Sequence, residues 1–199
     1  MGVVVGISAP NLPVAPTAYD RRYQDQFSNA LRLFFNSVTN KINAPVPHGS
    51  YYDTTTQTNP VADSVNLFTF NGVISEFKIS RGIPSSKIYI ADTGIYNFQF
   101  SVQLDKTGGG ASSVYIWPRV NGINLPDSAT KMVIDGPNNE VVAAWNFLLL
   151  MGAGDYFELA WQASDTAVVS VAEPATGNIP AIPSIILTTY WVSNSDTTS

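Results

Sequence analysis

The residues of this chain that could do chemistry are few and scattered. His48 is the only histidine, and it lies between Pro47 and Gly49. Without a second histidine there is no His pair for a metal, and no Ser-His system can form elsewhere, so we expect His48 to be a solvated loop residue. The chain has no cysteine, which excludes disulfides and thiolate metal sites. The sequence therefore predicts no cofactor and no metal centre.

A pair of carboxylates could in principle hydrolyse a glycosidic bond. The candidates are Asp127, Asp135, Glu140, Asp155 and Glu158. Any acidic chain offers such residues, and nothing in their spacing fixes the separation of a pair. The Gly108–Gly110 run lacks the Lys and Ser/Thr of a phosphate loop and is interpreted as a strand connection. We predict that the protein is not an enzyme, with polysaccharide hydrolysis as the rival hypothesis.

Tyr115, Trp117 and Arg119 alternate along one segment and would share one strand face. Such a stripe could stack on sugar rings, which predicts a glycan contact. It could equally be buried at a subunit interface. The second interpretation is favoured because the chain as a whole is short of charge.

Composition points toward assembly with other chains. Of the 199 residues, 45% are hydrophobic and only 13% are charged, whereas soluble domains carry about 25% charged residues. So few charges cover a monomer poorly, which suggests that some surface is buried against other subunits. The net charge is −5 and the pI is about 4.6, which argues against nucleic acid as a partner.

Residues 141–151 form the most apolar run. A membrane-spanning helix needs about 20 apolar residues, but this run ends at Gly152 and Gly154, so no membrane insertion is expected. We expect a hairpin, with residues 155–163 as its second strand. One face of the first strand carries Val141, Ala143, Trp145, Phe147 and Leu149; the other carries Val142, Ala144, Leu148 and Leu150. The second apolar face predicts contact with a sister subunit, although an end plug or an overlying loop could also cover it.

One convincing helix is predicted over residues 18–42. Thr17 and Asp20 form a capping-box pattern, while Asn43 and Pro45 mark the end. An apolar stripe recurs every three or four residues: Tyr23, Phe27, Leu31, Phe34, Val38 and Ile42. The helix either packs on its own domain or forms a self-associating trimeric neck. We favour the neck, because a Pro-rich linker separates the helix from the rest of the chain.

The first 16 residues are predicted to be extended, because Pro10, Pro13 and Pro16 prevent a continuing helix. They are either a disordered terminus or a docking arm that buries Val3, Val4, Val5 and Ile7 on a larger particle. The predicted organisation has five parts: a docking arm (1–16), a helical neck (17–43), a linker (44–50), a head (51–193) and a disordered tail (194–199).

From about residue 50 the hydrophobic period changes to two, as in residues 95–104. Asn71-Gly72 and Asn121-Gly122 predict type I′ hairpin turns. Strands are expected at 65–70, 73–79, 86–91, 95–104, 113–120, 140–151, 155–163, 167–172 and 184–192. Many short strands with such turns predict an antiparallel sandwich or barrel.

The order of four motifs carries a family resemblance. "GIYNFQFSVQL", "VYIWPRVNG", the long apolar strand and "GDYFELAW" together resemble the tumour necrosis factor-like jelly roll, which includes the globular heads of the first complement component. The resemblance spans about residues 50–193 and implies a mainly β, antiparallel jelly-roll head that trimerises. The ending "SIILTTYWVS" lacks the Phe-x-Gly-x-Leu of the complement heads, so none of their ligand sites are carried over.

A narrower resemblance covers nearly the whole chain. "YDRRYQDQFSNALRLFFNSV", "YYDTTTQT", "IWPRVNG" with "LPDSAT", and "VVAAWNFLLLMGAGDYFELAW" are similar to proteins of tailed phages, particularly marine and cyanobacterial ones. This resemblance implies a short trimeric fibre, knob or decoration on the exterior of a virion. Its partners would be other copies of itself, a capsid or tail protein that holds the N-terminus, and a host-surface glycan. Capsid attachment is slightly favoured over tail attachment.

Overall fold

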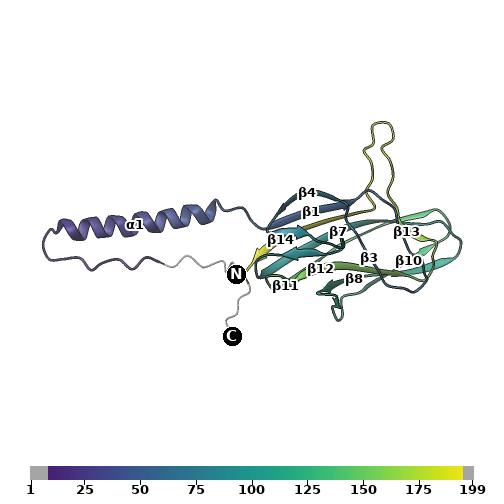
Figure 1. Ribbon diagram of the computed structural model, residues 1–199, viewed down its shortest axis with the longest axis horizontal. Coiled ribbons are helices and arrows are strands. Elements are labelled where there is room, and N and C mark those ends of the chain that lie inside the picture. Colours follow the sequence, from purple (N-terminus) through teal and green to yellow (C-terminus); the bar gives the residue numbers. More distant parts are fainter. Residues whose placement is uncertain (1–8, 195–199) are drawn as a thin grey trace. The chain divides into compact units, whose positions relative to one another are not determined.

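The computed structural model describes residues 9–194, and these form two units (Figure 1). The N-terminal unit contains the helix and ends at Pro45, and the head begins at Val46. The docking residues predicted before position 9 lie outside the described residues. The predicted tail does so as well, apart from its first residue.

The N-terminal unit contains one helix, α1 (Arg21–Ile42). Asp20 is its N-cap: one carboxylate oxygen accepts the backbone N–H groups of Arg22 at 2.8 Å and of Tyr23 at 3.4 Å. The predicted start near residue 18, with Thr17 as the cap, was therefore wrong, because the aspartate at the end of that pattern caps the helix itself. The predicted end was correct, since the C-cap is Asn43.

The head is built from two antiparallel sheets. Sheet A contains β1 (His48–Asp53), β2 (Gln57–Thr58), β4 (Gly72–Phe77), β7 (Gly94–Lys106), β11 (Asn139–Met151), β13 (Val168–Ser170) and β14 (Ile185–Ser193). Sheet B contains β3 (Asn66–Leu67), β5 (Ile79–Arg81), β6 (Ile88–Ile90), β8 (Ala111–Val120), β9 (Ile123–Asn124), β10 (Thr130–Asp135) and β12 (Tyr156–Ala163). Figure 1 shows these strands as two layers, with β1, β4, β7 and β14 on one side and β8, β10 and β12 on the other.

The strand pairing is nested. The first strand β1 pairs with the last, β14; β6 pairs with β12; β7 pairs with β11; and β8 pairs with β10. Every pair of strands is antiparallel, and the four pairs divide between the sheets: β1–β14 and β7–β11 lie in sheet A, and β6–β12 and β8–β10 lie in sheet B. This is the connectivity of a jelly roll. It confirms the predicted fold class: a mainly β antiparallel jelly roll preceded by a helix.

The core lies between the two sheets. The β7 side chains predicted to point inward are all buried: Tyr96, Phe98, Phe100, Val102 and Leu104. Phe98 of sheet A stacks on Phe157 of sheet B, with ring centroids 4.1 Å apart. Phe68 stacks on Trp161 at 5.4 Å. These cross-sheet aromatic contacts join the two layers and hold the sandwich together.

Two of the three expected hairpins do not form. Gly72 opens β4 in sheet A, while the preceding β3 lies in sheet B, so Asn71-Gly72 joins two sheets. Residues 152–155 likewise connect β11 of sheet A to β12 of sheet B, because β11 pairs along its whole length with β7. The prediction at Asn121-Gly122 is confirmed: both residues have positive φ, 52° and 77°, and they join β8 to β9.

The predicted linker 44–50 is wrong from His48 onward, because β1 begins there. His48 is half-buried. Its Nδ1 lies 2.8 Å from the carbonyl oxygen of Val46, and its Nε2 lies 2.9 Å from Ser75 Oγ on β4. It is a strand residue that ties β1 to its neighbour, and not a solvated loop residue. The sequence analysis also missed β10, whose only apolar residues are Met132, Val133 and Ile134.

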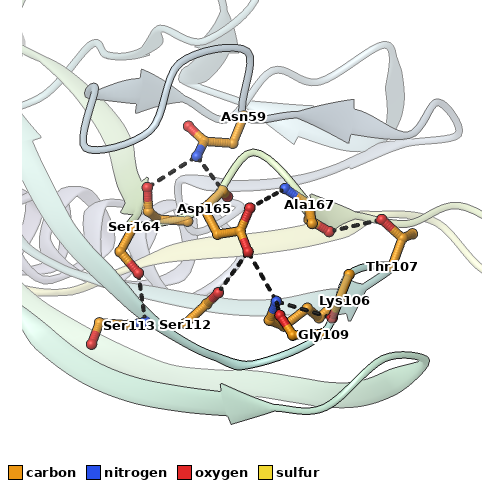
Figure 2. A network of polar contacts seen from close by, with 11 residues as sticks. Asn59, Lys106, Thr107, Gly109, Ser112, Ser113, Ser164, Asp165 and Ala167 are labelled. Carbon is orange, nitrogen blue, oxygen red and sulfur yellow. Dashed lines mark hydrogen bonds and ion pairs between the residues drawn. The ribbon is translucent and has the colours of Figure 1, made fainter.

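A buried lysine at the end of β7 lies in a network of polar contacts (Figure 2). Lys106 is fully buried, and its Nζ donates to the carbonyls of Gly108 at 3.0 Å and Gly109 at 2.9 Å and to Asp165 Oδ2 at 3.0 Å. All three N–H groups of the ammonium are therefore satisfied. The contacts fix the glycine run as a strand connection and give the Lys106–Asp165 pair a structural role.

Candidate functional surfaces

The outer face of sheet A carries an apolar row along β11 that is uncovered among the described residues. On β11, Val142 is 58% exposed, Leu148 is 61% exposed and Leu150 is 65% exposed, and Ala144 is also exposed. The alternate residues of β11 belong to the core or pack against it: Val141, Ala143, Trp145, Phe147 and Leu149. The prediction that both faces of this strand are apolar is confirmed. The subunit contact inferred from it remains a prediction.

The same face continues across the sheet to β14. Ile186, Tyr190 and Val192 are 39%, 44% and 44% exposed. Leu148 and Tyr190 flank the same β7 residue, Asn97, so they lie in one row across three strands. We define the sheet A patch as Val142, Leu148, Leu150, Ile186, Tyr190 and Val192. These apolar residues lie on β11 and β14, on either side of polar β7 residues such as Gln99. Exposed apolar side chains gathered on one face of a sheet favour an interaction site.

The sheet A patch has a polar centre on β7, where one pair of amides is hydrogen-bonded. Asn97 is 6% exposed, although it points outward from the sheet. Its Oδ1 accepts a hydrogen bond of 2.7 Å from Asn146 Nδ2 on β11. Because these two amides bind each other, covering this pair costs less desolvation free energy, whereas the exposed amide of the neighbouring Gln99 requires a polar partner.

Helix α1 is the second uncovered apolar surface, because none of its residues is buried. The predicted neck stripe is half-buried at Tyr23, Phe27, Leu31, Phe34 and Val38, and Ile42 is 76% exposed. Tyr23 stacks on Phe27 with ring centroids 6.1 Å apart. Phe35 and Leu33 add further apolar area, at 60% and 58% exposed. A helix with this much exposed apolar surface is typical of one that packs on partner helices.

On sheet B, the structure brings two of the three predicted glycan contacts together. Tyr115 and Trp117 line an open hollow of about 690 Å³ on the outer face of the sheet, together with Asp63, Asp127 and Gln162. Arg119 is not part of its lining. Its guanidinium instead donates to the carbonyl oxygen of Gly122 and lies 3.9 Å from Glu158 Oε2. The three residues alternate along β8 as predicted, but Arg119 binds the β8–β9 turn and does not line the hollow.

Two of the five candidate carboxylates, Asp155 and Glu158, have separate local roles. Asp155 accepts the backbone N–H of Gly152 at 2.7 Å and the side-chain amide of Asn121 at 2.8 Å, which orders two turns. Glu158 is buried beneath Arg119. The groups whose pKa is raised are core tyrosines: burial raises the pKa of Tyr96 to about 12 and that of Tyr51 further still. Packing explains these shifts without a catalytic site.

Residues 9–194 contain neither a cluster of metal-ligating side chains nor a candidate membrane-spanning helix. This part of the chain has no group of three or more His, Asp or Glu side chains placed to hold a metal ion. Over the same residues, no helix combines the length and the apolar character that crossing a membrane would require.

Several residues of the sheet A patch and of the sheet B hollow were not predicted from the sequence. Ile186, Tyr190 and Val192 alternate in "SIILTTYWVS", so the signal was present, but only the β11 half of the patch was identified. Asp63 and Gln162 had no such signal. They meet Tyr115 only because β12 pairs with β8 and because the segment before β3 reaches the same edge.

No family model matches the chain, and no curated protein does. Among solved structures, the fold is similar to the globular domain of a zebrafish complement 1qA protein. The TM-score is 0.48 and the sequence identity is 14%, over 76% of this chain and 100% of that chain. Similarity at this level carries no functional argument, so the jelly-roll assignment stands on the nested strand pairing described above.

Proposed function

We propose that this protein is a homotrimeric structural protein of a phage virion, with a helical neck and a displayed jelly-roll head. The single observation that carries the proposal is that one chain leaves two apolar surfaces uncovered, the sheet A patch and the α1 stripe. Sister subunits would cover both surfaces at once. The motif resemblance to trimeric heads favours three copies, and the resemblance to tailed-phage proteins favours the virion exterior.

The proposed mechanism is assembly and display, without catalytic turnover. Residues 1–16 would attach the trimer to a capsid protein, which we favour over a tail protein. Three arms on one trimer would bind with avidity if three equivalent sites lie within reach. The head would then face the host surface.

A phage that encodes the chain truncated to begin at Thr17 tests the attachment step. We expect the truncated protein to remain trimeric, with a near-normal melting temperature, and to be missing from purified particles. If the truncated protein is still incorporated, docking lies elsewhere in the chain. An antibody against the head should label intact particles that carry the full-length protein. If it does not label them, the virion role is wrong.

A further inference from the structure

The hollow on sheet B has an aromatic floor. Tyr115 and Trp117 lie on the outer face of β8, and Tyr115 pairs across the sheet with Gln162 of β12. The indole N–H of Trp117 donates to Asn124 Oδ1 at 2.9 Å, which fixes the ring, and only 8% of this residue is exposed. The half-buried phenol of Tyr115 is therefore the accessible ring against which a ligand could stack.

Two loops that are pinned to the sheet form the walls. The N–H of Asp63 donates to the carbonyl of Ala163 at 2.9 Å. The β9–β10 loop is joined to β8 by the N–H of Leu125, which donates to the carbonyl of Pro118 at 3.2 Å, and within the loop Ser128 Oγ donates to the carbonyl of Leu125 at 2.8 Å. Asp63 and Asp127 both adopt left-handed backbone conformations, with φ of 59° and 56°. Such conformations are uncommon outside glycine and persist where the surroundings fix them, so the backbone at both aspartates is held in place.

The polar groups around the hollow are mostly hydrogen-bond acceptors. Neither Asp63 nor Asp127 takes part in an ion pair within residues 9–194. Gln162 Nε2 makes only a long contact of 3.5 Å to Asp63 Oδ1, so its amide can also bind a ligand. Carboxylates and amides around an aromatic ring suit a ligand with several hydroxyl donors and an apolar ring face.

We propose that this hollow binds a neutral saccharide, with one sugar ring stacked on Tyr115 and its hydroxyls donating to Asp63 and Asp127. The two carboxylates without an ion-pair partner select against sialic acids and uronic acids, because like charges repel. Among residues 9–194, one cation lies over the stacking ring: Lys131 Nζ is 5.7 Å from the Tyr115 centroid. The inference gives the ligand class for the head's display role, and in that sense it rests on the proposed function.

The experiment uses the full chain and four neutral probes: methyl β-galactoside, methyl α-mannoside, methyl β-glucoside and N-acetylglucosamine. Glucuronate and sialic acid are the anionic comparisons. Saturation-transfer NMR and tryptophan fluorescence report binding at millimolar concentration. Tyr115→Ala and Asp127→Asn test the site, and asparagine tolerates the left-handed backbone at position 127. Tyr19→Ala and Asp135→Asn are matched controls, because both residues are exposed and lie outside the hollow.

We expect at least one neutral probe to bind, and each site variant to weaken that binding about tenfold or more. The control variants should leave it unchanged. Three results would overturn the inference: no binding by any neutral probe, equal binding by the site variants, or stronger binding of an anionic sugar. The solution mass of each variant is measured alongside. A protein of trimer mass without sugar binding contradicts this inference alone, whereas sugar binding by a monomer contradicts only the proposed assembly.

Discussion

The sheet A patch offers a matched pair of valines for testing the subunit contact. Val142 on β11 and Val133 on β10 are each 58% exposed in the single chain. Val142 belongs to the patch, and Val133 lies in the other sheet. A Val→Asp change therefore has a similar intrinsic cost at both positions, within the range of about 0.5 kcal/mol expected for surface substitutions. Any large difference between the two variants reports an interface.

The free energy that the trimer loses in Val142→Asp follows from the burial of this side chain in the proposed interface. Complete burial of a valine side chain stabilises by about 1.5–2 kcal/mol, so covering the exposed part of Val142 is worth about 1 kcal/mol per subunit. Replacing it by aspartate removes that term and also buries an unpaired carboxylate, which costs several kcal/mol at each site. Three symmetric copies bring the loss to roughly 10 kcal/mol per trimer, and since each 1.4 kcal/mol is a factor of ten, the trimer should dissociate completely at micromolar concentration.

Light scattering after size exclusion measures the outcome, and near-ultraviolet circular dichroism checks that the head remains folded. We expect Val142→Asp to give a folded monomer and Val133→Asp to keep the mass of the unchanged protein. If both variants retain that mass, Val142 does not lie in the interface and the reasoning from the exposed β11 face is refuted. Equal dissociation of both variants would contradict it as well, because the effect would not be specific to the patch.

Two further predictions concern the neck and the buried lysine. Phe34→Asp should reduce the α1 helical signal in circular dichroism and dissociate the neck while the head stays folded, since losing a buried Phe costs about 3–5 kcal/mol per site. Asn36→Asp, on the opposite side of the helix, is the control. An unchanged spectrum and mass for Phe34→Asp would show that Phe34 does not lie between the helices of the neck. The backbone N–H of Ala167, followed by Lys106, lowers the pKa of Asp165, so its stabilising contribution is complete above the ordinary pKa of about 3.9 and is lost as the pH falls through the lower, folded value. The melting-temperature difference between the unchanged protein and Asp165→Asn should thus shrink below about pH 4, and a difference that is independent of pH would contradict the ion pair.

The long, strongly patterned elements could be predicted from the sequence. Two predictions are confirmed: the alternation of β7 from Tyr96 to Leu104, and the apolar character of both faces of β11. In each strand the period of two determines which side chains point into the core. The failures have physical causes. In β1, "HGSYYD" buries Gly49, Tyr51 and Asp53, a mixture of residue types that carries no hydrophobic period.

The turns failed for a different reason. Asn71-Gly72 and residues 152–155 have hairpin residues, but local turn chemistry does not determine whether the next strand pairs with its predecessor or crosses to the other sheet. The sheet B hollow depends on the same long-range pairing: Gln162 faces Tyr115 through the β12–β8 register, and no local pattern encodes that. The sequence pattern assigns the residues of one strand to a face of the sheet. It does not predict which residues of different strands meet in one site.

The solution mass of the full chain tests the central claim most directly. One chain weighs 21.5 kDa, and the proposal requires that the sheet A patch and the α1 stripe be covered by two sister chains. Multi-angle light scattering at micromolar concentration should give three times the chain mass. A mass of one chain, with the head folded and α1 helical, would show that both apolar surfaces remain exposed and would contradict the trimeric assembly.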